Sequence, residues 1–274
     1  MRTVKRRDFL GGAIAACAAS LPALGQGAPR DGRAPLTMPQ LEALVRGQLG
    51  GKLTCVRTPE SVDGPYYSET SLQRRAIAEG ERGLRMRLGI TVANALMEGS
   101  ACAPLAGAIV DVWQANADGV YSNVITELQG RDTTGQTFLR GHQVTDQNGY
   151  VEFDTLVPGW YLGPMPEPVG VIARAPHVHV KVFLDHKIVT TQLYFPDRFL
   201  EDLYRGTEPY SAHRSLIVPG GSKRYDRIQN REDMVFVADK ARPMSIERQA
   251  DGVRATATIG LVTLGSEGFA PLFR

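Results

Sequence analysis

Residues 84–92 read Leu-Arg-Met-Arg-Leu-Gly-Ile-Thr-Val, a run in which apolar side chains alternate with polar or small ones. Successive side chains of a β-strand point to opposite faces, so this period of two predicts a strand with one buried face. Similar short runs recur at residues 108–113, 150–153, 177–184, 189–195, 235–237 and 255–262. The chain is therefore expected to contain at least seven short strands.

Turn-forming residues separate these runs. Glycine, proline, asparagine and aspartate gather at residues 116–119, 146–149, 158–159 and 219–221, and such clusters mark turns. The 29 glycines and 17 prolines of the chain also favour short strands over long helices. The pattern predicts an all-β fold: an antiparallel β-sandwich with short helices and long loops.

The first 25 residues have the composition of an export signal rather than of a folded element. A basic start is followed at residues 9–24 by mostly small or apolar side chains. Arg6-Arg7, followed by Asp8-Phe9-Leu10, resembles a twin-arginine signal, which exports folded proteins. Two alternatives stay open: an ordinary secretory signal, and a lipoprotein signal in which Cys17 ends a lipobox-like sequence. We therefore expect the mature protein in the periplasm or secreted.

The formal charge of +2 comes from this segment. Residues 1–25 carry four basic residues and one acid, so the remaining chain lies near −1. Such a charge does not indicate a nucleic-acid-binding surface. The content of 43% hydrophobic and 22% charged residues is typical of a soluble globular protein. No run of 18 apolar residues occurs, so no membrane span is predicted.

Three segments are expected along the chain. Residues 1–25 form the signal, residues 26–54 form a linker with one short helix, and residues 55–274 form the β-sandwich domain. A second short helix is expected after Pro196, where apolar residues recur at helical spacing.

The cysteines indicate one disulfide. Cys55 and Cys102 are an even pair in an exported chain, whereas Cys17 leaves with the signal or is lipidated. Closing that loop would stabilise the fold by about 4 kcal/mol in the chain-entropy model.

The pair His177-Val178-His179 is the strongest indication of chemistry. Both imidazoles share one strand face, about 6.6 Å apart along the chain, so both can approach one metal ion. An iron(II) facial triad needs a carboxylate, but Asp185 lies about 20 Å beyond His179 on a straight strand. A zinc lyase or hydrolase would need a third histidine, with these candidates: His142, His186 and His213. These residues alone leave the metal open.

Four ordered stretches carry a more specific resemblance. They are residues 63–67 (Asp-Gly-Pro-Tyr-Tyr), 104–121, 154–161 (ending Pro-Gly-Trp-Tyr) and 174–182, followed by residues 191–196. The chain resembles the intradiol ring-cleavage dioxygenases, the family of catechol and protocatechuate dioxygenases, and looks most like their exported branch. The resemblance extends from about Cys55 to Phe236.

The resemblance implies a non-haem iron(III) site held by two tyrosinates and two histidines. The matching residues are Tyr121, which ends an Asp-Gly-x-Tyr turn, Tyr161, His177 and His179. Tyr161 corresponds to the axial ligand that substrate displaces. Phenolates are hard anionic donors that suit a hard trivalent ion.

The same resemblance implies the reaction. A catechol-type ring would be opened by O₂ between its two hydroxyl-bearing carbons, giving a muconate-type diacid. Arg174 would stabilise charge on the ring, with Gln192 as a supporting polar contact. A structural role would instead pair Arg174 with a carboxylate such as Glu167 or Asp185. The implied partners are a small aromatic diol and O₂, and a homo-oligomer is compatible with the sequence.

Residues 162–173 depart from the family, because this segment is longer than the usual link in the exported branch. The insertion is expected to border the site. A second rival, besides the zinc enzyme, is a non-catalytic transthyretin-like module, which residues 104–108, 145–149 and 156–159 also fit. Such modules lack the added tyrosine and histidine set, which distinguishes the two interpretations.

Changing both Arg6 and Arg7 to lysine should trap the precursor in the cytoplasm, if the signal is of the twin-arginine type. Fractionation of cells that produce the wild type and the double variant measures this. Normal delivery of the variant to the periplasm would refute the twin-arginine interpretation.

Overall fold

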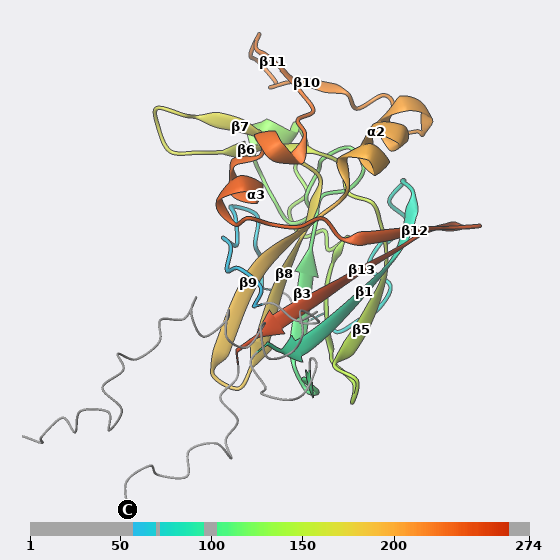
Figure 1. Ribbon diagram of the computed structural model, residues 1–274. Helices are drawn as coiled ribbons and strands as arrows, with labels where there is room; N and C mark the ends of the chain where they lie inside the picture. Colours follow the sequence, from blue (N-terminus) through green and yellow to red (C-terminus); the bar gives the residue numbers. More distant parts are fainter. Residues whose placement is uncertain (1–56, 70–71, 96–102, 263–274) are drawn as a thin grey trace, which may run out of the picture. The chain divides into compact units, whose positions relative to one another are not determined.

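Two β-sheets packed face to face form the framework of the part of the chain that the computed structural model describes, residues 57–69, 72–95 and 103–262 (Figure 1). The expected signal, the linker helix and the pair Cys55 and Cys102 lie outside these residues, so they stay predictions. Within the described ranges, no helix has the length and apolarity to cross a membrane.

The first sheet has five strands and is organised around β1. Its strands in spatial order are β12 (Ser245–Gln249), β13 (Gly252–Leu261), β1 (Arg85–Asn94) and β2 (Ala103–Pro104), and β5 (Tyr150–Leu156) also pairs with β1. The second sheet has four strands in the order β4 (Arg140–Val144), β3 (Ile109–Trp113), β8 (His177–Leu184) and β9 (Lys187–Tyr194).

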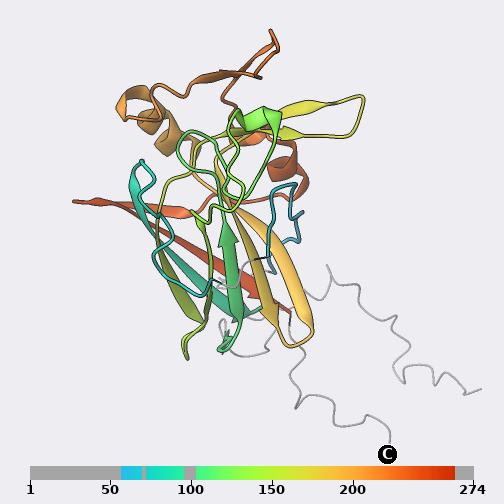
Figure 2. The ribbon, with the colours of Figure 1, turned by 180° about the vertical axis from the view of Figure 1, so that it is seen from behind.

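Shorter elements gather at one end of the sandwich, as the two opposite views show (Figures 1 and 2). Two are hairpins, β6 (Tyr161–Pro164) with β7 (Val171–Arg174) and β10 (Ser215–Ile217) with β11 (Arg224–Asp226). The helical elements are η1 (Glu127–Gln129), α2 (Asp197–Gly206), η2 (Asn230–Glu232) and α3 (Met234–Ala238).

The core lies between the two sheets, and alternation along the strands builds it. One face of each sheet supplies fully buried aliphatic side chains to the same cluster, among them Leu88, Ile90, Val92, Val178, Val180 and Val182. Burying each such side chain contributes about 1.5–3 kcal/mol. The intervening residues of β8, His177, His179 and Lys181, therefore point to the opposite face of the four-stranded sheet.

The structure confirms the all-β sandwich and most of the expected strands. The runs at 84–92, 108–113, 150–153, 177–184, 189–195 and 255–262 lie in β1, β3, β5, β8, β9 and β13, respectively. The helix expected after Pro196 is α2, and it buries Phe199, Leu200 and Leu203.

Residues 235–237 were expected to form a strand, and this was wrong, because they lie in α3. The Asp233 side chain accepts hydrogen bonds from the backbone N–H groups of Val235 and Phe236, which caps the start of a helix. Three apolar residues are too few to distinguish a strand from a helix turn by periodicity.

The expected antiparallel pairing of strands fails for one pair. β1 and β13 pair in parallel, from Met86 opposite Val253 to Asn94 opposite Leu261. Parallel neighbours need a long connection, and nearly all of the fold lies between these two strands in the chain. Several strands of two to five residues were not expected, because so short a run shows no period; among them are β6 and β7, the hairpin formed by the insertion at 162–173.

Candidate metal centre

The four candidate ligands lie together, although they come from three separate parts of the chain. The Nε2 atoms of His177 and His179 are 3.0 Å apart, and Tyr161 Oη lies 3.3 Å from His177 Nε2. The ring of Tyr121 stands edge-on to that of Tyr161, with centroids 5.0 Å apart. Each of the four side chains is at most 2% exposed. The structure thus brings the predicted set into one buried cluster.

Strand pairing and one backbone contact orient the two histidines. Trp113 on β3 lies opposite His179 in the register and stacks on its ring at 4.8 Å, with an interplanar angle of 8°. His177 Nδ1 lies 2.7 Å from the carbonyl oxygen of Ala175 and donates to it. The Nε2 atom of His177 is therefore unprotonated and directed into the cluster, as a metal ligand requires.

Different contacts hold the two tyrosines in place. Tyr161 begins the hairpin β6–β7 and lies opposite Arg174 at its base, so the insertion joins two of the predicted site residues. Tyr121 lies in the loop after β3, where its carbonyl oxygen accepts a hydrogen bond of 2.6 Å from Thr133 Oγ1. Gln129 Oε1 accepts from the Tyr121 backbone N–H at 3.1 Å.

A roof segment, residues 62–67, covers the cluster. Asp63 at its start pairs with Lys181 Nζ at 2.7 Å, which ties the segment to β8. Gly64 has a φ of +75°, and a Cβ built there would lie 3.2 Å from His179 Cε1. The ring of Tyr66 packs on that of Tyr121 at 4.8 Å. The backbone at Gly64 therefore limits where the His179 ring can move.

Tyr121 Oη, one of the candidate donor atoms, is buried without a hydrogen-bond partner. Two nitrogens that each bind one ion at about 2.1 Å lie about 3.0 Å apart when their bonds meet near a right angle. The Nε2–Nε2 distance of 3.0 Å has this value. The donor set of two imidazole nitrogens and two phenol oxygens thus fits a single metal ion.

The electrostatic environment favours neutral imidazoles, the form in which histidine binds a metal. Tyrosine binds a metal as a phenolate, and this environment stabilises a phenolate only with a cation beside it. Burial, and then the positive charge of Arg174, lowers the pKa of His177, and burial also lowers that of His179, so both rings are neutral. Burial raises the pKa of both Tyr121 and Tyr161. A phenolate in this cluster therefore needs a positive charge beside it.

Arg174 lies at the edge of the cluster and is 4% exposed. Its Nε donates to Asp233 Oδ2 at 2.9 Å, and its Nη2 donates to Gln192 Oε1 at 2.6 Å. Nη1 lies 3.5 Å from Tyr161 Oη. Arg174 and Gln192, the two residues predicted to assist the reaction, are thus in contact. The carboxylate that pairs with Arg174 is Asp233, and not Glu167 or Asp185, which the structural alternative had named.

Sequence reasoning missed Asp233, Tyr194 and Trp113, which contact the predicted residues. Register could have indicated Tyr194, since it lies two residues after Gln192 on β9 and so shares its face. Nothing in the local sequence indicates that Asp233 returns to Arg174 across 59 residues.

The histidines considered for a zinc site do not join the cluster. His186 is exposed in the turn after β8, and His213 Nε2 donates to the Trp160 carbonyl oxygen at 2.9 Å. In the described part of the chain, no group of three His, Cys, Asp or Glu residues is placed to hold a metal. The four side chains that do converge supply imidazole nitrogens and phenol oxygens instead.

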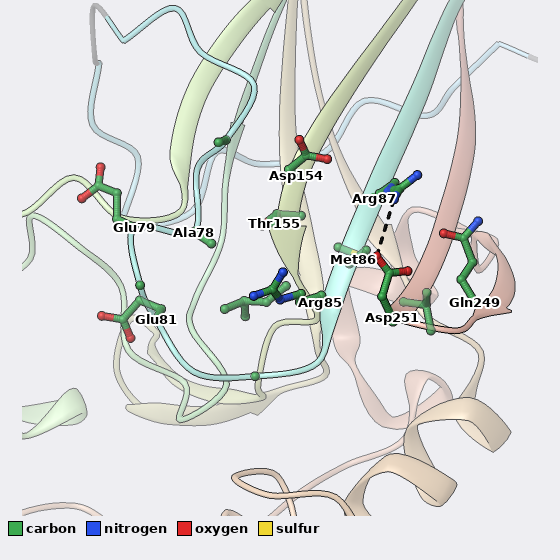
Figure 3. A pocket seen from close by; sticks show the side chains of 16 residues that line it. Ala78, Glu79, Glu81, Arg85, Met86, Arg87, Asp154, Thr155, Gln249 and Asp251 are labelled. Atoms are coloured by element: carbon green, nitrogen blue, oxygen red, sulfur yellow. Dashed lines mark ion pairs between the residues drawn. The ribbon is translucent and has the colours of Figure 1, made fainter.

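A pocket of about 470 Å³ lies elsewhere, between the start of β1, β5 and the turn from β12 to β13 (Figure 3). Charged side chains line it, and Arg87 and Asp251 form an ion pair of 3.5 Å across it. None of the four candidate ligands is among its lining residues. This pocket is separate from the metal cluster.

The fold and the cluster define a β-sandwich protein with buried nitrogen and phenol-oxygen donors gathered beside the four-stranded sheet. The family model described as Dioxygenase matches residues 62–219, more than half of the chain. The chain belongs to the intradiol ring-cleavage dioxygenase family.

Individual relatives agree with this assignment. An intradiol ring-cleavage dioxygenase from Tetranychus urticae has a similar structure, with a TM-score of 0.59 and 27% identity over 77% of this chain and 96% of that chain. The dioxygenase domain of a dioxygenase carbohydrate-binding protein fusion from Streptomyces sp. SirexAA-E gives 0.51 and 28%, over 76% and 99%. The chlorocatechol 1,2-dioxygenase of Rhodococcus opacus is 29% identical over 59% of this chain and 63% of its own length. The chain thus spans less than two thirds of that relative.

Replacing Gly64 by alanine should displace His179 and weaken metal binding by about tenfold, the lower end of what loss of a supporting contact costs. Gly107→Ala is the matched control, since Gly107 has a φ of +79° but open space around its Cβ position. Both variants should lose stability from backbone strain, by about 1 kcal/mol or more. Metal titrations and thermal melts measure the two effects, and equal metal affinity in both variants would contradict the proposed contact.

Proposed function

We propose that this protein is an iron(III) dioxygenase that cleaves catechol-type rings between the hydroxyl-bearing carbons with O₂, giving muconate-type diacids. The observation that carries the proposal is the buried convergence of Tyr121, Tyr161, His177 and His179 in a chain of the intradiol family. The similar curated proteins include chlorocatechol and catechol 1,2-dioxygenases, which supports a small aromatic diol as substrate.

The four ligands suit iron in its trivalent state. Two phenolates and two neutral imidazoles give a donor set with two negative charges, which favours a hard trivalent cation over a divalent one. When bound, iron(III) would supply Lewis-acid activation of the diol and a template for the reactants. The chain's part is to hold the donors in a dry, shaped site, and the burial of all four side chains meets that requirement.

Tyr161 is the ligand that we propose gives way to substrate. Its Oη lies 3.3 Å from His177 Nε2 and 3.5 Å from Arg174 Nη1, so it has a positive group beside it as well as the metal position. The charge of Arg174 lowers the pKa of Tyr161 against the effect of burial. Arg174 would thus stabilise a Tyr161 phenolate, whose Oη could accept a proton from the diol.

Arg174 would then act on the substrate itself. A fixed positive charge in a site that excludes water stabilises negative charge as it develops, at no reorganisation cost. The short bond to Gln192 Oε1 occupies Nη2, which leaves Nη1 as the nitrogen that faces the ligand cluster. We assign Gln192 the supporting role of holding that orientation.

The two rival functions have less support. A zinc enzyme would need a further histidine at the cluster, and among the described residues none of His142, His186 and His213 has a contact with His177 or His179. A transthyretin-like binding module would share the sandwich, but it gives no reason for two tyrosines and two histidines to be buried together with Tyr121 Oη unpaired. We also place the enzyme outside the cytoplasm, on the strength of Arg6-Arg7 in the N-terminal segment.

The purified protein should hold one iron per chain and be red-brown, because iron(III)–phenolate bonding absorbs visible light. His179→Ala should lose most of the metal, since one imidazole and two phenolates leave an open, weak site. His186→Ala, at an exposed turn, is the matched control and should keep its iron. Elemental analysis and visible spectra measure both; a colourless wild type with stoichiometric zinc would end the dioxygenase proposal.

Arg174→Ala should still bind iron and change colour with catechol, but turnover per iron-loaded molecule should fall by ~10² to 10³. The variant leaves Asp233 buried without its partner, so we also expect a loss of about 3–5 kcal/mol in stability. Arg174→Lys keeps the charge but not the planar fork, so it should recover only part of the rate.

Oxygen uptake and thermal melts on the same samples distinguish catalysis from structure. A purely structural Arg174–Asp233 pair predicts a lower melting temperature with near-normal turnover per folded, iron-loaded molecule. That result in Arg174→Ala would refute the catalytic role.

A further inference from the structure

Asp233 reaches the site from outside the region that defines the family, since the family match covers residues 62–219. It follows η2 and immediately precedes α3, and its side chain is completely buried. An isolated buried carboxylate is strongly unfavourable, so its partners decide why it is there.

Both carboxylate oxygens of Asp233 are used, and they face different elements. Oδ2 accepts from Arg174 Nε and from the Ala175 backbone N–H, both at 2.9 Å. Oδ1 accepts from the backbone N–H groups of Val235 at 3.0 Å and Phe236 at 3.1 Å. The carboxylate therefore joins the start of α3 to the end of β7, directly ahead of the histidine strand.

The guanidinium of Arg174 is planar and rigid, so two anchors determine where its third nitrogen lies. Asp233 holds Nε, and Nη2 donates to Gln192 Oε1 at 2.6 Å and to Tyr194 Oη at 3.0 Å. Only Nη1 makes no short bond, and its nearest acceptor is Tyr161 Oη at 3.5 Å. The anchors thus direct Nη1 to the candidate displaceable ligand.

We propose that Asp233 is a positioning residue for ring cleavage: it acts through Arg174, with Tyr194, to hold Nη1 beside Tyr161. The inference rests on the proposed function, because it gives Arg174 a task at the substrate. Tyr194 completes the arrangement, since its hydroxyl also donates to Gln192 Oε1 at 2.8 Å and lies 3.4 Å from Asp233 Oδ1.

Helix capping alone does not account for this geometry. A helix cap needs one side-chain oxygen, and Oδ1 supplies it. Oδ2 instead accepts a hydrogen bond from Arg174 at the end of β7. Stability alone is also a weak reason, because a buried ion pair is often no more stable than apolar residues of equal volume. What an apolar replacement would lose is the fixed direction of the guanidinium.

Asp233→Asn retains the shape and the capping oxygen but removes the charge that holds Nε. We expect kcat per iron-loaded molecule to fall by about 10², the effect of misplacing a catalytic group by roughly 1 Å, with KM and iron content near wild type. In an Arg174→Ala background the same change should alter kcat less than about threefold, because residues that act through one another are not additive.

Leu88→Ala is the control for lost stability, since Leu88 is fully buried in the other sheet. It should lower the melting temperature and leave kcat per iron-loaded molecule unchanged. A near-normal kcat in Asp233→Asn, or an equal loss of rate in the Arg174→Ala background, would overturn the inference.

Tyr194→Phe provides a second test of the positioning role if Asp233→Asn fails to fold. It removes one hydroxyl from Arg174 Nη2, and kcat should fall about fivefold, the value of one hydrogen bond; an unchanged kcat would count against the inference. Failure of the proposed function looks different, because the wild type itself would then turn over no catechol. A crystal structure of Asp233→Asn also tests the position of Nη1 without any turnover, and an unmoved guanidinium would refute the positioning role.

Discussion

The two faces of β8 are the constraint on which the rest of the structure depends. Val178, Val180 and Val182 close the core against β1, and this fixes the rotation of the strand. Because side chains alternate, His177 and His179 must then face the other way. A slip of one residue would bury both imidazoles in the hydrocarbon core, so hydrophobic burial itself sets the direction of the metal ligands.

Charge balance is the second constraint, because the site sits in an environment that penalises unpaired charge. Two cations near the cluster pair with carboxylates: Lys181 with Asp63, and Arg174 with Asp233. Burial raises the pKa of Tyr121 and Tyr161, and the positive charge of Arg174 offsets only part of this, so their phenolates still lack full compensation from protein groups. A trivalent metal would supply that compensation, so binding would stabilise the fold as well as enable the chemistry.

Sequence reasoning succeeded where a local pattern of residues determines the structure. Period-two alternation identified β1 and β8, the spacing of His177 and His179 indicated a metal site, and the resemblance to the intradiol family added Tyr121 and Tyr161. It failed where the structure depends on contacts between distant parts of the chain. The parallel pairing of β1 with β13 and the return of Asp233 to Arg174 join residues far apart in sequence, and no local period encodes either. The run at 235–237 failed for a related reason, since a side-chain cap from Asp233 decided between helix and strand.

The hairpin β6–β7, which contains the insertion expected at 162–173, indicates how the chain could change in length beside the site. Tyr161 and Arg174 form the pair at the base of the hairpin β6–β7, while the inserted residues make up the rest of it. The base is held by contacts to other elements: Arg174 to Asp233 and Gln192, and Ala175 to Asp233. Residues beyond the base can therefore lengthen or shorten the hairpin without moving the two functional side chains, as surface loops generally allow.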